Sequence, residues 1–322
     1  MRVLVTGGAG YIGSTLVPLL LGQGHAVRVL DGLMYGGQSL LGMWDHPEFE
    51  FLKGDIRDAA VVPDAVAGID AVVHLAAIVG DPACARAPET ARAVNLEASL
   101  ALLEECRRAK VARFVFASTC SNYGRMKDPT CYVDERSELA PVSLYAETKV
   151  AVERVLLDPR QTGGITATPL RFATVFGVSP RMRLDLTVNE FTAEMLTKAR
   201  LQVYGEQFWR PYIHVRDAAR AIAGALAAPT AVVGNQVFNV GSTDQNYQKR
   251  QLVELIRPYA PHAAVEFVHR DEDPRDYRVS FARICERLHF QVTRSVPDGV
   301  GEVVRLVQSG LLGDLSEPRY RN

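Results

Sequence analysis

The chain has 322 residues, with 36 lysines and arginines against 37 aspartates and glutamates, so its formal net charge at pH 7 is −1. This balance excludes a protein that binds nucleic acid through a broad basic surface, and 48% hydrophobic residues exclude a disordered chain. No apolar run reaches the roughly 18 residues of a membrane-spanning helix, so we expect no membrane association. The five cysteines form no CxxC pair and the seven histidines are scattered. We therefore expect free thiols, a reducing cytoplasm and no metal site.

Short apolar runs alternate with helical patterns through the first half of the chain. Strands are predicted over Arg2–Thr6, Val27–Asp31, Glu50–Gly54, Ala71–His74, Arg113–Ala117 and Ile165–Arg171. Helices are predicted over Tyr11–Gln23, Asp58–Ala67, Glu89–Lys110 and Leu144–Leu157. This alternation predicts an α/β fold with a doubly wound parallel (Rossmann) sheet that is covered by helices on both faces.

The pattern changes after Gly177, where prolines and clustered arginines interrupt the alternation. A helix over Leu186–Ala199 and strands over Tyr212–Val215 and Gln236–Val240 are predicted there. We therefore expect one domain over residues 1–177 and a smaller mixed α/β C-terminal domain over residues 178–322, with the chain returning to the sheet around residues 211–241. The polar tail Gly313–Asn322 is expected to be loosely ordered.

A glycine-rich loop with the sequence GGAGYIG joins the first predicted strand to the first predicted helix. Gly7 permits a tight turn, Gly10 lets the backbone approach a pyrophosphate at the helix N-terminus, and Gly13 allows close packing of the helix on the strand. Tight turns are the commonest use of such glycines, but this strand–loop–helix context favours a dinucleotide. Asp31 ends the second strand, where a carboxylate accepts both ribose hydroxyls and repels a 2′-phosphate. The loop and Asp31 predict NAD over NADP; the alternative is a solvated loop aspartate.

Tyr145 and Lys149 lie one turn apart on one face of the predicted helix Leu144–Leu157. Such pairs often arise by chance, but behind a dinucleotide loop they have a mechanism. Ionising a tyrosine with a pKa of about 10 costs roughly 4 kcal/mol at pH 7, and a neighbouring ammonium and the positive nicotinamide ring lower that cost. Thr119 follows the strand Arg113–Ala117, at the edge where parallel sheets bind ligands, so its hydroxyl is predicted to contact a reacting oxygen. For Ser118 and Asn122 a polar turn is the favoured interpretation.

With these residues in view, the chain resembles the extended short-chain dehydrogenase/reductase family, and within it the NAD-dependent nucleotide-sugar epimerases and dehydratases similar to UDP-glucose 4-epimerase. The resemblance covers nearly the whole chain and rests on segments such as TGGAGYIG, STCSNYG, YAETK, RPYIHVRD and FNVG. It implies that NAD is bound by Gly7, Gly10, Tyr11, Ile12, Gly13, Asp31, Asp55, Ile56, Leu75, Ala76, Ala77, Asn95, Tyr145 and Lys149. It also implies a catalytic group of Thr119, Tyr145 and Lys149.

The same resemblance implies that residues 178–322 mainly bind a nucleotide-diphosphate sugar. The contacts with this substrate would come from Thr119, Ser121, Thr174, Asn189, Arg210 and Arg275. A homodimer is expected, because helices that flank the sheet commonly pair in this family. Arg181 and Arg183 could meet an anionic sugar, although solvated arginines are the commoner explanation. His214 is expected to be a core or turn histidine, and Trp209 either covers a base or merely packs.

Departures from the family pattern bear on the reaction. In 4,6-dehydratases the catalytic threonine is followed by Asp and Glu, and UDP-glucuronate decarboxylases keep the Glu; here the two positions hold Cys120 and Ser121. A serine hydroxyl has no accessible pKa for that base role. Thr174 stands where hexose 4-epimerases usually place an asparagine, so the identity of the sugar stays open.

The predicted function is therefore an NAD-dependent nucleotide-sugar epimerase that acts at C4 through a transient 4-keto intermediate. The alternative is an NDP-4-ketosugar reductase, and a dehydratase is less favoured. A regulatory protein that binds NAD without turnover is disfavoured by the intact set of Thr119, Tyr145 and Lys149.

Overall fold

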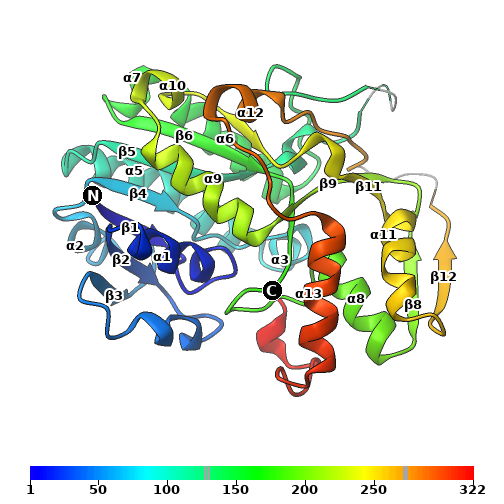
Figure 1. The fold of residues 1–322 in the computed structure, drawn as a ribbon. Coiled ribbons are helices and arrows are strands. Elements are labelled where there is room, and N and C mark those ends of the chain that lie inside the picture. The colour runs from blue at the N-terminus through cyan, green and yellow to red at the C-terminus, as the bar shows by residue number, and fades with distance from the viewer. Residues whose placement is uncertain (127, 129–130, 271–274) are drawn as a thin grey trace.

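A seven-stranded sheet forms the centre of the molecule in this computed structural model, which describes residues 1–126, 128, 131–270 and 275–322 (Figure 1). The strand order is β10-β6-β5-β4-β1-β2-β3, and every neighbouring pair is parallel. The strands are β1 (Arg2–Thr6), β2 (Ala26–Asp31), β3 (Phe49–Lys53), β4 (Ala71–His74), β5 (Arg113–Thr119), β6 (Thr166–Phe172) and β10 (Phe238–Val240). The predicted doubly wound sheet is confirmed, and its order reverses between β1 and β4, where such sheets bind their ligands.

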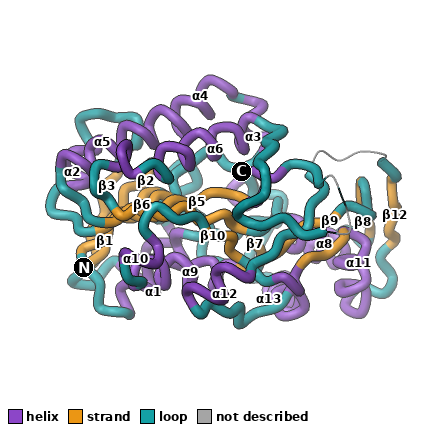
Figure 2. The backbone as a smooth tube through the Cα atoms, turned by 90° about the horizontal axis from the view of Figure 1, so that it is seen from above, coloured by secondary structure: helices purple, strands orange, loops and turns teal. Residues whose placement is uncertain are grey.

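Helices cover both faces of this sheet (Figure 2). One face carries α1 (Gly13–Gly22), α9 (Val215–Ala227), α10 (Thr230–Val233) and α12 (Ala282–Leu288). The other carries α2 (Val62–Val66), α3 (Asp81–Arg86), α4 (Pro88–Arg92), α5 (Ala98–Arg108) and α6 (Leu144–Leu156), and α7 (Pro159–Thr162) follows α6 in the chain. Strand side chains alternate between the two cores: Val3 and Val5 pack with α1 and α9, whereas Leu4 packs with α2 and α5. Burial on both faces explains why β1 reads as an unbroken apolar run.

Among the described residues, two small sheets and the helices packed on them lie beside the carboxyl edge of the main sheet. A three-stranded sheet has the order β11-β9-β7, and β12 pairs with β8 in a parallel two-stranded sheet. These strands are β7 (Thr174–Phe176), β8 (Arg200–Tyr204), β9 (Trp209–His214), β11 (Asn246–Gln248) and β12 (Ala264–Val268). They pack against α8 (Thr187–Thr197), α11 (Lys249–Ile256) and α13 (Val296–Gln308). Because β10 lies in the main sheet, the division into domains at residue 177 stays a prediction.

Two predicted helices and the predicted loose tail differ from the structure. The predicted helix Glu89–Lys110 is interrupted by a π-helical turn over Ala93–Glu97, between α4 and α5. The predicted helix Asp58–Ala67 shortens to α2. The expectation of a loose tail is wrong, because Tyr320 is buried and its carbonyl accepts a hydrogen bond from the Leu184 N–H at 2.8 Å. A polar composition does not reveal that one tyrosine in the tail packs on a distant loop.

Within the described residues, no helix is both long and apolar enough to cross a membrane. All five cysteines are free thiols, three of them buried.

Candidate active site

The glycine-rich loop is folded so tightly that side chains have no room at two of its predicted positions. Gly7 has φ +74°, and a Cβ there would lie 2.8 Å from the Ala76 nitrogen. A Cβ on Gly13 would meet the Gly7 carbonyl oxygen at 2.4 Å, so Gly13 makes room for the loop itself and not for a strand. The contact with a strand belongs to Gly8, whose added Cβ would lie 2.6 Å from the Val29 side chain. This bare backbone at the start of α1 fits a pyrophosphate, which needs N–H groups and close approach.

Asp31 fastens this loop and stands beside it at the end of β2. Its Oδ2 accepts a hydrogen bond from the Ala9 N–H at 2.9 Å, and its Oδ1 accepts one from the Leu33 N–H at 2.8 Å. Partial burial raises the pKa of the carboxyl group. A carboxylate has about four acceptor positions, so two stay available for ribose hydroxyls. These contacts do not fit a solvated loop aspartate.

The neighbouring predicted cofactor residues follow β3 and β4. Asp55 is exposed and forms an ion pair with Arg57 at 2.6 Å, which lowers its pKa, whereas Ile56 is buried. The loop after β4 is held to β1, because the Leu75 and Ala76 N–H groups donate to the carbonyl oxygen and Oγ1 of Thr6. Ala77 follows this pair in the same loop. All of these residues lie at one edge of the sheet, on either side of the glycine loop.

Two predicted cofactor residues use their side chains inside the protein. Asn95, in the π-helical turn, binds both backbone groups of Ile78, at 2.8 and 2.9 Å, and so holds the loop that contains Leu75–Ala77. The Tyr11 hydroxyl donates to the Gly177 carbonyl oxygen at 2.6 Å, and burial raises its pKa. Ile12 directly precedes α1. The side chains of Tyr11 and Asn95 are therefore engaged within the protein, and a contact of Tyr11, Ile12 or Asn95 with the cofactor stays a prediction.

The predicted catalytic residues come together from β5 and α6. Thr119 ends β5, and its Oγ1 accepts the Ser121 N–H at 3.1 Å. The Lys149 Nζ donates to the Ala117 carbonyl oxygen at 2.8 Å and lies 5.8 Å from the centroid of the Tyr145 ring. Burial lowers the pKa of Lys149 to about 8 and raises the pKa of Tyr145 above its ordinary value. In the protein without ligands, burial therefore raises the pKa of Tyr145 by more than the Lys149 ammonium group is expected to lower it.

A buried ion pair lies next to these predicted catalytic residues, and no motif in the sequence predicts it directly. Glu153, one turn after Lys149 on α6, binds Arg171 of β6 at 2.7 Å. The same carboxylate accepts hydrogen bonds from the Ser118 hydroxyl and, at 2.8 Å, from the Asn122 amide. Ser118 and Asn122 are thus structural, as their sequence interpretation favoured. The signal available was the spacing of Glu153, four residues from Lys149 on the same helical face.

On the substrate side, Arg275 forms an ion pair with Asp81 Oδ2 at 2.8 Å. The Ser143 hydroxyl donates to the other oxygen of Asp81 at 2.7 Å. Burial is the main cause of the raised pKa of Tyr145, and the Asp81 charge adds to it. Sequence reasoning missed Asp81, although it follows the cofactor loop by a few residues and begins α3. Its carboxylate is close enough to Tyr145, the predicted catalytic tyrosine, for its charge to act on the pKa of that residue.

Tyr277 also joins the substrate side, and sequence reasoning missed it as well. Its hydroxyl lies 3.2 Å from the Ser121 Oγ, and the Arg210 guanidinium lies 5.4 Å from its ring centroid. Thr174 is in β7 and pairs with Tyr212 of β9, the strand that contains Arg210. Ser121, Arg210 and Thr174 therefore belong to connected elements at the same side of the molecule.

Asn189 is fully buried, and its amide holds the segment that follows β7. Its Oδ1 accepts the Gly177 N–H at 2.9 Å, and its Nδ2 donates to the Arg183 carbonyl oxygen at 2.8 Å. Arg183 in turn forms two hydrogen bonds with Asp185, and its charge favours a lower pKa of Tyr145. Arg181 and Arg183 are both buried, so the expectation of solvated arginines is wrong. Asn189 therefore holds the backbone of the segment in which both arginines are buried.

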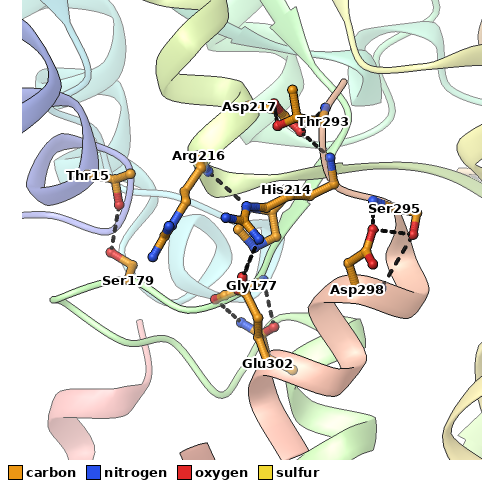
Figure 3. A network of polar contacts seen from close by, with 12 residues as sticks. Thr15, Gly177, Ser179, His214, Arg216, Asp217, Thr293, Ser295, Asp298 and Glu302 are labelled. Carbon is orange, nitrogen blue, oxygen red and sulfur yellow. Dashed lines mark hydrogen bonds and ion pairs between the residues drawn. The ribbon is translucent and has the colours of Figure 1, made fainter. Parts of the chain in front are cut away.

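His214 is a structural histidine, as expected from the sequence (Figure 3). Its Nδ1 accepts the Arg216 N–H at the start of α9, so its Nε2 carries the proton and donates to Glu302 of α13 at 2.8 Å. Gly177 lies against this ring, where a Cβ would approach Nε2 to 2.1 Å. Burial lowers the pKa of His214. This network fastens α9 to α13 behind the active site.

Residues 3–241 match the model of the NAD dependent epimerase/dehydratase family. The chain belongs to this family. It is 31% identical over 317 residues to a dTDP-glucose 4,6-dehydratase of Actinoplanes sp., covering 94% of this chain and 97% of the relative. It is 28% identical over 275 residues to a UDP-glucose 4-epimerase of Corynebacterium glutamicum, covering 81% of each. The structure of the UDP-glucose 4-epimerase of Thermus thermophilus in complex with NAD superposes with a TM-score of 0.83 and 29% identity, covering 96% of this chain and 99% of that one.

Membership in the NAD-dependent epimerase/dehydratase family confirms the resemblance to extended short-chain dehydrogenase/reductases and makes NAD the cofactor. The bare glycine loop and the Asp31 carboxylate fit that cofactor on structural grounds. Both epimerases and dehydratases occur among the relatives, so the chain is an enzyme of this family whose reaction the relatives leave open.

Proposed function

We propose that the protein is a nucleotide-sugar 4-epimerase. The observation that carries the proposal is the environment of the two residues after Thr119. Cys120 is buried and its Sγ–H donates to the Arg171 carbonyl oxygen, while Ser121 is hydrogen-bonded to Tyr277. Burial also raises the pKa of the Cys120 thiol well above its ordinary value. Neither residue is an acid or base that drives loss of water, so the proposed fate of a 4-keto sugar is return to an alcohol.

The chemistry that NAD supplies when bound is reversible hydride transfer at a carbinol carbon. Tyr145 is the proposed acid and base, which takes the proton of the C4 hydroxyl and gives it back to the C4 keto oxygen. Because the Thr119 Oγ1 already accepts the Ser121 N–H, its own proton is available for a hydrogen bond to the same sugar oxygen. Lys149 holds a positive charge near the Tyr145 ring, which favours the phenolate during proton removal. The proton that leaves the C4 oxygen returns to it, and the hydride that would pass from C4 to bound NAD would return to the same carbon, so the whole cycle would be redox-neutral.

Substrate binding is proposed to use the positively charged side chains near this group. Arg275 and Arg210 suit the oxygens of a diphosphate, since a guanidinium offers a fork of donors. Arg275 is paired with Asp81, whose charge acts on Tyr145. We infer that a nucleotide-diphosphate sugar binds here, because UDP-glucose occupies a related epimerase structure from Thermotoga maritima with a TM-score of 0.85 and 27% identity.

A dehydratase is the second candidate, because the Actinoplanes relative carries that name and Asp81 is a carboxylate beside Tyr145. Asp81, however, is paired with Arg275 through one oxygen and hydrogen-bonded by Ser143 through the other. Both oxygens therefore already have partners, and this arrangement favours the epimerase.

The test is incubation of the purified protein with UDP-glucose, dTDP-glucose or UDP-glucuronate in deuterated water, without added cofactor, followed by NMR of the products. The expected product is the C4 epimer without deuterium on carbon. Deuterium at C5 with a 4-keto-6-deoxy product indicates the dehydratase, and dependence on added NADH indicates a reductase.

Tyr145→Phe should lower turnover by roughly 10²–10⁴-fold, the usual contribution of a general acid–base group, with folding intact. Thr119→Val should have a smaller effect, because it removes a hydrogen bond and not the proton acceptor. Tyr259→Phe, at an exposed tyrosine, is the matched control and should keep full activity. Near-normal turnover of Tyr145→Phe would reject the proposed mechanism.

A further inference from the structure

A cavity of about 750 Å³ lies on the face of the sheet that carries α1 and α9, opposite the face covered by α6. It is bounded by α1, the turn at Tyr35 after β2, the segment 178–182, the start of α9 and the C-terminal residues after α13. Its apolar wall includes Pro18, Leu19, Val178, Met182, Leu306 and Leu312. None of the residues assigned above to NAD, catalysis or the sugar nucleotide lines it. The volume lies within the range of pockets that hold small organic ligands.

The charged residues of this cavity are all positive. Four arginines line it, and the described part of the chain contributes no acidic residue to its wall. Arg220 is paired with Asp217 at 2.6 Å and Arg319 with Glu317 at 2.9 Å, both outside the wall. Figure 3 shows the Arg216 side chain extending from the start of α9 toward Ser179 and Thr15, which also line the cavity. An unbalanced positive wall around an apolar floor favours an anion that has an apolar body.

Arg181 gives the second, independent observation. Only 6% of the surface of this residue is exposed, and it lines the cavity. Its Nη2 donates to the Arg321 carbonyl oxygen at 3.1 Å, but its Nε and Nη1 are buried without a hydrogen-bond partner among the described residues. The nearby carboxylate of Asp185 forms an ion pair with Arg183. A buried cation without a counter-charge is strongly unfavourable, and an anion in the cavity would relieve this imbalance.

An aromatic side chain completes the site. The centroid of the Tyr35 ring lies 4.0 Å from the Arg181 guanidinium carbon, and Tyr35 is 38% exposed in the wall of the cavity. It can therefore contact the ring of a ligand while Arg181 contacts the charge.

We propose that this cavity is a second ligand site, separate from the active site, for an organic anion with an aromatic or apolar body. Arg181 and Arg216 bind the anionic group, and Tyr35, Leu19 and Met182 contact the body. The site adjoins the cofactor loop, because the Ser179 hydroxyl donates to the Tyr11 carbonyl oxygen at 2.7 Å. The proposal does not depend on which reaction the enzyme catalyses.

The test uses the enzyme saturated with NAD and UDP, so that the active site is filled, and 8-anilinonaphthalene-1-sulfonate as the probe. Fluorescence titration should show one saturable site. Arg216→Gln should weaken binding by about tenfold or more, the value of one charge-assisted hydrogen bond. Arg216 is exposed, and its backbone N–H, which the variant keeps, is the group that His214 binds. This variant should therefore keep its melting temperature and its affinity for NAD.

Two controls test whether binding depends on the negative charge of the probe and on the position of the substituted arginine. N-phenyl-1-naphthylamine has the same aromatic body without the sulfonate, and its binding should be weaker and unaffected by Arg216→Gln. Arg287→Gln, at an exposed arginine of α12, should leave the binding of the sulfonate unchanged. A second variant within the cavity, Arg181→Met, should weaken the binding of the sulfonate probe as Arg216→Gln does.

Three results would overturn the proposal. The first is the absence of saturable binding to the NAD- and UDP-saturated enzyme. The second is equal weakening by Arg287→Gln and Arg216→Gln. The third is competition between the probe and NAD, or a change in the affinity for NAD without a change in the affinity for the probe in Arg181→Met. Either result would assign the cavity to the cofactor site.

Discussion

Glu153→Gln removes the counter-charge of Arg171 while keeping the size of the side chain. Both partners are almost completely buried, and Arg171 donates to Glu153 through Nε at 3.0 Å and through Nη2 at 2.7 Å. The variant leaves the Arg171 guanidinium buried without a negative charge. Loss of one partner of a buried ion pair costs about 3–5 kcal/mol of the free energy of unfolding, out of the about 5–15 kcal/mol of a typical protein.

The double variant Glu153→Leu/Arg171→Met separates the charge from the packing. It leaves no uncompensated ion, but the Ser118 hydroxyl and the Asn122 amide lose the acceptor that they share. Two such orphaned donors cost about 1 kcal/mol each at least, so the double variant should lose about 2 kcal/mol. The double variant is therefore expected to be more stable than either Glu153→Gln or Arg171→Met alone.

Urea denaturation followed by circular dichroism measures these free energies. The exposed pair of Glu104 and Arg107 provides the control, and Glu104→Gln should change the free energy of unfolding by less than about 1 kcal/mol. A free energy of unfolding for Glu153→Gln within about 1 kcal/mol of the parent would show that Arg171 does not need this counter-charge. Simple addition of the losses of the two single variants in the double variant would show the same.

The remaining predictions concern pH and binding. Burial lowers the pKa of His74 to about 3, from 6.5, so the unfolded chain binds a proton there before the folded protein does. Stability should therefore fall by up to about 1.4 kcal/mol per pH unit below 6.5. The urea midpoint of the parent should be lower at about pH 4 than at about pH 6, and this difference should become smaller in His74→Gln but not in the exposed control His262→Gln. Asp31→Ala should weaken NAD binding and narrow the preference for NAD over NADP in calorimetry, whereas Asp45→Ala should change neither; an unchanged preference would count against Asp31. Because the Asp81 charge adds to burial in raising the pKa of Tyr145, Asp81→Asn should move the rise of the pH–rate profile to lower pH and Asp81→Glu should not; a shift to higher pH would contradict this assignment.

The sequence predicts best where local chemistry decides the structure. The bounds of β1 and β4 are as predicted, because strands buried on both faces must be continuously apolar. β5 continues past its prediction through Ser118 and Thr119, since Glu153 and the Ser121 N–H satisfy these polar groups. The pairing of β8 with β12 was not predicted, because neither short strand carries a signal for its distant partner.

In the candidate active site, too, features set by neighbouring residues were predictable and contacts between distant segments were not. Gly7 and the pair Tyr145 and Lys149 depend on spacing within one loop or one helix, so the sequence reveals them. The contacts of Asp81 with Arg275 join segments far apart in the chain, and only the folded structure brings them together. Asn189 was predicted from the sequence to contact the substrate, and that contact stays a prediction. Its complete burial and its hydrogen bonds to Gly177 and Arg183 are visible only in three dimensions.

The π-helical turn Ala93–Glu97 restricts how the length of this part of the chain can vary. It amounts to one extra residue within a helical segment that runs from Pro88 to Arg108. Each residue of an α-helix turns the next by about 100°, so deletion of one residue would restore a regular helix and rotate Asn95 away from Ile78. The loop that follows β4 would then lose its hydrogen bonds at Ile78, although no residue of that loop had been changed. Insertions and deletions should consequently be far rarer in this helix among related enzymes than its ordinary amphipathic sequence suggests, and an aligned family would show its length as invariant.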